Sequence, residues 1–192
     1  MTGVLALQAD ALLMTQVRAG DSASFATLLN RHRLGVIHFL YRMVLNQAVA
    51  EELAQEVFLR VYRARESYEP TARFTTWLFR IATHMGLNWL RDEKARHSTG
   101  SLDASPQSGS EQQIRDRRPN VEARLLNEVR LEEVRRAIRA LPEKQRAAVL
   151  MHKYEEMDYT QIAAVLGCSE SALKSLLFRA YETLREKLAH CV

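Results

Sequence analysis

The stretch from Asp158 to Tyr181 constrains the fold of this chain more than any other, and it reads DYTQIAAVLGCSESALKSLLFRAY. Its apolar residues recur at helical spacing, stop at Gly167, and resume after Ser169. Glycine tolerates the positive φ angle that a sharp turn requires, and the small Ala163 permits two helices to cross closely. The pattern therefore predicts a helix-turn-helix, a motif that is typical of DNA-binding proteins.

The second helix of this motif is predicted to begin at Glu170 and to lie in the major groove, with its first turns towards the bases. Basic side chains can bind phosphates or guanine edges, a serine can bond to either, and an aromatic ring can contact a thymine methyl group. Ser169 is expected to cap the helix and leave its N-terminal amides near a phosphate. The predicted DNA-facing residues are Ser169, Glu170, Ser171, Lys174, Ser175, Phe178 and Arg179. Protein contact is the alternative use of this motif.

The other face of the motif is predicted to be core. The inward-pointing residues are Ile162, Leu166, Leu173 and Leu176. Cys168 is expected to be a small residue packed among them, because a free cysteine is more often a buried hydrophobe than a redox switch.

Composition favours an all-α protein. Glycine and proline are scarce, with 7 and 4 residues among 192, and no strand-like alternation is present. The formal net charge is +4, a mild basic excess that is compatible with nucleic acid. No apolar run approaches the roughly 18 residues that span a membrane, and the N-terminal residues lack the basic region of a signal peptide. We therefore expect a cytoplasmic protein without direct membrane insertion.

Enzymatic and metal-binding functions are the least expected. The sequence contains no HExxH motif, P-loop or nucleophile elbow, and its histidines are scattered. The two cysteines, Cys168 and Cys191, form no Cys-x-x-Cys pair and no disulfide framework. We expect no catalytic residue, no metal, no cofactor and no small-molecule substrate.

Helical periodicity in the first half of the chain predicts four helices. They are expected over Asp10–Arg18, from a cap at Asp21 onwards, over Ala48–Arg65, and from about residue 75 to Arg96. His32 lies on or beside an apolar stripe, and no second metal ligand is near it in sequence. We therefore expect a packed histidine. The helix over 48–65 has acidic residues near its start and arginines near its end, which suits either a solvated face or a partner-binding face.

The fourth helix is predicted to carry a polar face on which three arginines accompany a tryptophan. Spacings of three and four residues place these side chains in one sector: Arg73, Trp77, Arg80, His84, Asn88 and Arg91. Arginines bind phosphates, and aromatic rings stack on unpaired bases. The opposite side is expected to be core and comprises Phe74, Leu78, Ile81, Ala82, Met85 and Trp89. The alternative is that Trp77 belongs to the core and that the arginines are only solvated.

A change of composition after His97 predicts two domains. Residues 98–120 are rich in Ser, Gly, Gln and Asp, so they are expected to form a linker. The linker separates a domain at 8–97 from one at 121–190, and its fully extended reach is about 75 Å. The second domain should contain a helix from Val121 to about Ala140 and a helix after Pro142, before Asp158 and Gln161 form a capping box.

Three separated stretches together resemble an extracytoplasmic-function (ECF) sigma factor of bacterial RNA polymerase. They are LAQEVFLRVYRA, FTTWLFRIATHMGLNWLR, and the C-terminal ALPEKQRAAVLMHKYEEMDYTQIAAVLGCSESALKSLLFRAYETLREKL. The resemblance covers nearly the whole chain in the right order, so its joint pattern is specific. It implies a first domain like sigma region 2, a second like region 4, and a linker that threads through the polymerase towards the RNA exit path.

The resemblance also implies partners and site residues. Core polymerase is the main partner, through its β′ clamp helices and its β subunit, and the implied β′-docking residues are Leu53, Gln55, Glu56 and Phe58. The −10 promoter element would be recognised and opened by the loop from Tyr68 to Phe74 and by the polar face that begins at Arg73. The helix after Ser169 would bind the −35 element, and an anti-sigma factor would hold the protein inactive.

Two residues depart from the family pattern. His84 stands where the family often has asparagine, which bears on the −10 base preference and adds a group that titrates near neutral pH. Leu176 stands where many members have arginine, so one basic contact to the −35 element is expected to be absent. Two other functions remain open from the residues alone: an autonomous helix-turn-helix regulator, and an interaction module that sequesters another factor.

Overall fold

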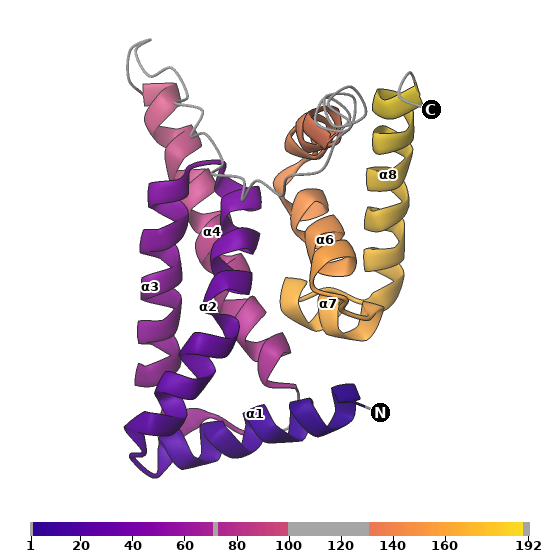
Figure 1. Cartoon of the computed structure of the whole chain (residues 1–192). Helices are drawn as coiled ribbons and strands as arrows, with labels where there is room; N and C mark the ends of the chain where they lie inside the picture. The colour runs from indigo at the N-terminus through magenta and orange to yellow at the C-terminus, as the bar shows by residue number, and fades with distance from the viewer. Residues whose placement is uncertain (1, 71–72, 100–130, 190–192) are drawn as a thin grey trace, which may run out of the picture.

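The computed structural model describes residues 2–70, 73–99 and 131–189, and within these ranges every regular element is a helix (Figure 1). The predicted all-α class is confirmed. Most of the predicted linker lies outside the described residues, as does the first part, 121–130, of the helix predicted after it.

The N-terminal half contains four α-helices and one short 3-10 turn. They are α1 (Thr2–Arg18), α2 (Ser22–Val44), α3 (Gln47–Arg63), η1 (Arg65–Ser67) and α4 (Phe74–Thr99). Helix α1 is longer than its expected range, and α4 continues beyond His97 into the first two residues of the predicted linker. Asp21 caps α2 as predicted, because its carboxylate accepts a hydrogen bond from the Ala23 amide at 3.0 Å.

Helices α2, α3 and α4 pack side by side, and α1 lies across one end of them (Figure 1). Their core is built from apolar side chains that are fully or almost fully buried, and Phe39 meets Phe79 edge-on with 5.3 Å between ring centroids. The buried Asp10 fixes α1 in place, because its carboxylate binds both Arg31 and His32 on α2. The His32 ring also lies 5.4 Å from that of Phe74, which confirms the prediction of a packed histidine.

The C-terminal half begins with helical residues 131–139 and continues through α6 (Glu143–Tyr154), α7 (Tyr159–Leu166) and α8 (Glu170–Leu188). The predicted capping box at the start of α7 is present. The Asp158 carboxylate accepts from the Gln161 amide at 2.8 Å, and the Gln161 side chain accepts from the Asp158 amide at 2.9 Å. Gly167 ends α7 at φ 63°, so the glycine stands where the turn requires a left-handed residue.

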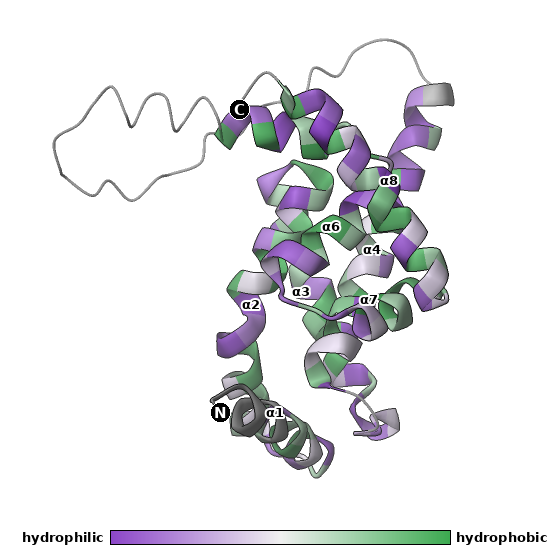
Figure 2. Cartoon of the chain, turned by 90° about the vertical axis from the view of Figure 1, so that its right-hand side faces the viewer, coloured by the Kyte–Doolittle hydropathy of each residue, from purple (hydrophilic) through white to green (hydrophobic). Residues whose placement is uncertain are grey.

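The two halves pack directly against each other. Helix α4 runs beside α7, and α2 beside α6, so the buried side chains of both halves form one continuous core. Figure 2 shows the turned view, in which α6 and α7 lie against the α2 and α4 side of the molecule. No helix among residues 2–70, 73–99 and 131–189 is long and apolar enough to cross a membrane.

Candidate nucleic-acid interface

Helix α8 presents a polar face to solvent and an apolar face to the core. Leu173, Leu177 and Ala180 are buried and anchor the helix against α6 and α7. All seven residues predicted to face DNA are exposed, from Ser169 to Arg179. Ser169 caps the helix as predicted, because its hydroxyl accepts from the Ala172 amide at 3.2 Å. The anchored side therefore leaves the opposite side available to a partner.

The exposed side of α8, which we call the recognition face, has a mixed chemistry. Lys174, Ser175, Phe178 and Arg179 line a shallow hollow on it. Phe178 is 66% exposed, which is unusual for a large apolar ring and marks a contact surface. The Thr160 hydroxyl donates a hydrogen bond to the Glu170 carboxylate at 2.7 Å, and this bond joins the two helices of the motif. Lys174 and Arg179 remain as the basic groups around the exposed ring.

Two residues of the motif pack against the core instead of facing solvent. Leu176 and Cys168 are partly buried against the core. Leu176 thus contributes to packing, and it lies beside the core rather than in the middle of the recognition face.

Helix α4 carries the predicted polar face. Arg73, Arg80, His84, Asn88 and Arg91 are all exposed. We refer to these five residues together with Trp77 as the α4 polar face. With three arginines and an amide on one side of a helix, the surface suits phosphates and unpaired bases.

Aromatic rings support one end of the α4 polar face. Trp77 is partly buried, with its ring centroid 5.1 Å from that of Tyr68 and 6.1 Å from that of Phe74. Tyr68 and Phe74 are only 3% and 1% exposed, and burial raises the pKa of the Tyr68 hydroxyl. The structure therefore places Trp77 at the boundary between core and surface, and it places the two neighbouring rings in the core. Phe74 is both a predicted core residue and a predicted −10 residue, and it occupies the core position.

A cleft runs along the α4 polar face where the two halves meet. His84, Asn88 and Arg91 line its N-terminal-half side, and Glu143, Lys144 and Leu166 line the opposite side. Lys94 forms an ion pair with Glu143 across the cleft. The hydrogen bond from Lys94 holds the pKa of the Glu143 carboxyl below its usual range. Half of the polar face is thus flanked by an acidic group from the C-terminal half.

The residues predicted to dock on polymerase lie on α3 at different depths. Gln55 is exposed, Leu53 and Glu56 are partly buried, and Phe58 is in the core with 4% exposure. Phe58 therefore supports the helix from inside in this conformation. The sequence interpretation missed Leu59 and Tyr62, which are 49% and 40% exposed on α3. A large apolar residue four positions after Gln55, on the charged side of the helix, is the signal that identifies Leu59.

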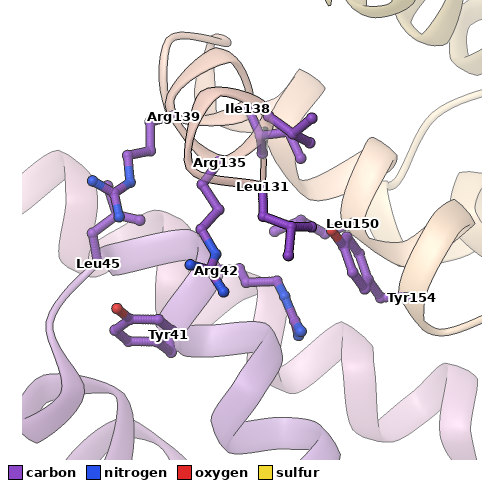
Figure 3. A pocket seen from close by; sticks show the side chains of 10 residues that line it. Tyr41, Arg42, Leu45, Leu131, Arg135, Ile138, Arg139, Leu150 and Tyr154 are labelled. Carbon is purple, nitrogen blue, oxygen red and sulfur yellow. The ribbon is translucent and has the colours of Figure 1, made fainter. Parts of the chain in front are cut away.

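A second composite cavity, of about 200 Å³, lies between the C-terminal end of α2 and the helical residues 131–139 (Figure 3). Leu131, Ile138 and Leu150 contribute apolar surface. Its basic side chains are Arg42, Arg135 and Arg139. The Arg42 guanidinium lies 4.2 Å from the centroid of the Tyr154 ring, a cation–π contact between the two halves.

No group of three or more potential metal ligands occurs among the residues that the structure describes. One polar face lies on the second helix of a capped helix-turn-helix, and the other lies on α4 next to an aromatic cluster. Together they define a class of protein: a two-part, all-helical DNA-binding protein.

Comparison with known proteins identifies the family. The family profile described as sigma-70 region 2 matches residues 28–96, and that described as sigma-70, region 4 matches residues 131–184. The chain is 31% identical over 184 residues to the ECF RNA polymerase sigma-E factor of Escherichia coli strain K12, covering 93% of this chain and 94% of that protein. It is 35% identical over 177 residues to RNA polymerase sigma factor CarQ of Myxococcus xanthus, covering 91% and 95%.

The chain belongs to the ECF sigma factors of the sigma-70 family. It is therefore a non-enzymatic initiation factor that binds core RNA polymerase and promoter DNA and drives transcription initiation. This assignment replaces the autonomous regulator and the sequestering module that the residues alone left open.

Solved structures share the fold. CnrH in complex with the cytosolic domain of CnrY aligns with a TM-score of 0.68 at 24% identity, covering 95% of this chain and 98% of that one. The sigma factor RpoE in complex with the anti-sigma factor NepR from Bartonella quintana aligns with a TM-score of 0.64 at 22% identity, covering 86% and 96%.

Proposed function

We propose that the recognition face of α8 binds the −35 promoter element and that the α4 polar face binds the −10 element. The observation that carries this division is the separate exposure of the two faces on helices that are anchored by buried side chains. On α8, Lys174 and Arg179 reach phosphates or guanine edges while the 66%-exposed Phe178 contacts a thymine methyl group.

At the −10 element, strand opening requires that unpaired bases be held outside the stack, at a cost of a few kcal/mol per base. The arginines of the α4 polar face bind the strand's phosphates, and Trp77 offers the edge of a supported aromatic cluster for stacking. Tyr68 and Phe74 act by holding Trp77 in position, because their own rings are buried. His84 supplies a titratable hydrogen-bonding group where many relatives are expected to have an amide.

Helix α3 is the proposed docking surface for the β′ clamp helices of core polymerase. Gln55 and Leu59 are exposed on this surface, and the partly buried Leu53 and Glu56 lie at its edge. Phe58 fixes the helix from the core side. An apolar residue within a polar surface is the arrangement expected of a contact that becomes desolvated on binding.

The proposed domain limits are 8–97 and 121–190, joined by the linker at 98–120. We further propose that the protein acts in the cytoplasm, where polymerase and promoter DNA are found, and that an anti-sigma factor restrains it. One similar solved structure is a complex of the sigma factor RpoE with the anti-sigma factor NepR, and another is a complex of CnrH with the cytosolic domain of CnrY. The first of these supports the proposal of an anti-sigma factor by analogy.

Co-purification with core polymerase, followed by run-off transcription on genomic promoters, tests the proposed division. We expect a shared −35 sequence and a shared −10 sequence among the active promoters. The Arg179→Ala variant should lose its preference at the −35 element alone, and the His84→Asn variant should change preference at the −10 element alone. A change at the same element in both variants would contradict the assignment of the two faces.

A further inference from the structure

The cavity between α2 and the helical residues 131–139 has a chemistry that none of the proposed promoter or polymerase contacts uses. It encloses about 200 Å³, and Figure 3 shows side chains from both halves around it. Leu131 and Tyr154 line it and are 50% and 47% exposed, whereas Leu150, which also lines it, is fully buried. Two large, exposed apolar side chains beside one hollow indicate a contact surface that the core of this chain does not fill.

Guanidinium groups from both halves line the same cavity. They belong to Arg42 of α2 and to Arg135 and Arg139 of the C-terminal half, and the lining side chains that the structure describes include no acid. Glu132 pairs with Arg135 and Arg139 at 3.6 and 3.7 Å, which is longer than a charge-assisted hydrogen bond. The buried Nε of Arg139 has no hydrogen-bond partner within the described part of the chain. The cavity therefore presents cationic groups that can bind an anion.

The neighbouring acids carry less charge than these arginines. Glu132 faces two of the three guanidinium groups, and the carboxyl of Glu155 interacts with the charge of Arg42. Burial raises the pKa of Glu155 to about 7, so this carboxyl is only partly ionised near neutral pH. Three positive charges are thus opposed by fewer than two negative ones, and this imbalance favours an anionic ligand.

We propose that this cavity is a binding site for a small aromatic carboxylate, whose carboxylate pairs with the arginines and whose ring packs against Leu131 and Tyr154. An arginine matches a carboxylate because two of its N–H groups can donate in parallel. A ring matches the remaining surface because it packs on aliphatic side chains, on another ring and on the face of a guanidinium group. The site lies apart from the recognition face, the α4 polar face and the α3 docking surface, so it does not depend on their assignments.

The volume of the cavity limits the ligand to about one ring. A protein cavity of about 150 Å³ holds benzene, so the 200 Å³ of this cavity accommodates a ring and one carboxylate. Sites for drug-sized molecules are larger, at about 300–1,000 Å³. A nucleotide is therefore too large to be enclosed. Inorganic phosphate would leave the apolar surface unfilled, and a neutral ring would leave the arginines without an anion.

Fluorine NMR of the full-length chain, with 4-fluorobenzoate as the probe, measures this binding directly. For a ligand of this size we expect a Kd on the order of 0.1–1 mM. Two further probes separate the parts of the ligand: 4-fluorobenzyl alcohol keeps the ring without the charge, and trifluoroacetate keeps the charge without a ring. Both should bind at least about tenfold more weakly, because each loses one set of contacts. Equal binding of all three probes, or no saturable binding of 4-fluorobenzoate up to about 10 mM, overturns the proposal.

One pair of substitutions tests whether the anion binds in the cavity. Arg135→Gln removes a lining guanidinium group and should weaken 4-fluorobenzoate binding about tenfold. Arg136→Gln is the matched control, because Arg136 is the next residue, is exposed and is not one of the lining residues. Both variants should keep the helix content of the unchanged chain, since neither side chain belongs to the core. Equal affinity of the two variants for 4-fluorobenzoate overturns the proposal.

Photolabelling locates the ligand without any substitution. The probe 4-azidobenzoate keeps the ring and the carboxylate, and on illumination it reacts with the residues beside it. We expect peptide mass spectrometry to find the label at the C-terminal end of α2 and within residues 131–139, and excess benzoate to prevent this labelling. Labelling confined to other peptides, or labelling that excess benzoate does not reduce, refutes a site in this cavity.

Discussion

We predict that Glu155 makes the packing between the two halves dependent on pH. Its carboxyl lies at the contact between the two halves, because a Cβ atom added to Gly35 of α2 would be 3.9 Å from its Oε2. Burial raises the pKa of Glu155 from 4.5 to about 7, and the positive charge of Arg42 on α2 opposes this rise. We therefore predict that replacing Glu155 with glutamine, which is uncharged at every pH, stabilises the folded protein at pH 8.

The direction of this stability change follows from proton binding. The folded protein binds the Glu155 proton more tightly than the unfolded chain does. The contribution of Glu155 to stability is therefore greatest below about pH 4.5, falls as pH rises from 4.5 to about 7, and is constant above that range. One pKa unit corresponds to about 1.4 kcal/mol, which limits the effect to about 3 kcal/mol. Solvent screening of this partly exposed group reduces the expected effect to about 1–2 kcal/mol.

Thermal unfolding measures this effect. For a chain of this size, 1 kcal/mol shifts Tm by about 2–4 °C, so Glu155→Gln should melt about 2–8 °C above the unchanged chain at pH 8. The two proteins should converge towards pH 5. Glu156→Gln is the matched control, because the neighbouring Glu156 is exposed. Parallel melting curves for Glu155→Gln and the unchanged chain across pH 5–8 would refute the assignment.

Three substitutions test the proposed surfaces. Arg179→Ala should weaken binding to the −35 element by about 1–3 kcal/mol in gel-shift titrations, and an unchanged −35 preference removes it from the set of base-contacting residues. Leu59→Arg should reduce affinity for core polymerase without altering helix content, because this side chain is 49% exposed; pull-down at full strength would exclude Leu59 from the docking surface. Trp77→Ala should slow strand opening, measured with a fluorescent base at the −10 element, more than it weakens duplex binding. Unfolding of the N-terminal half instead would mean that the tryptophan acts only as a core residue.

The local structure was largely predictable because each signal depends on neighbouring residues. The capping box of Asp158 and Gln161, the turn at Gly167 and the cap at Ser169 all follow from side-chain chemistry within a few positions, and all are confirmed. The polar face of α4 was predictable for the same reason, since spacing alone places Arg80, His84, Asn88 and Arg91 in one exposed sector.

Long-range packing was not predictable in this way. The interface between the halves joins residues about 100 positions apart, such as Arg146 and Met43, and no periodic pattern connects them. The burial of Phe58 and Tyr68 also depends on neighbours from other helices. Sequence spacing therefore could not distinguish a ring packed in the core from a ring that contacts a partner. Arg146 directly precedes the apolar run from Ala147 to Met151, but sequence spacing does not show that its guanidinium is buried or that it binds the Met43 carbonyl oxygen.

Site-specific photocross-linking within the complete polymerase–promoter complex tests the central claim most directly. A photoreactive residue is placed at Phe178 in one protein and at His84 in another, since both side chains are exposed. The division of the two faces predicts cross-links from position 178 to the −35 duplex and from position 84 to the opened −10 strand. Cross-links from both positions to the same element, or from position 84 to duplex DNA only, would contradict it.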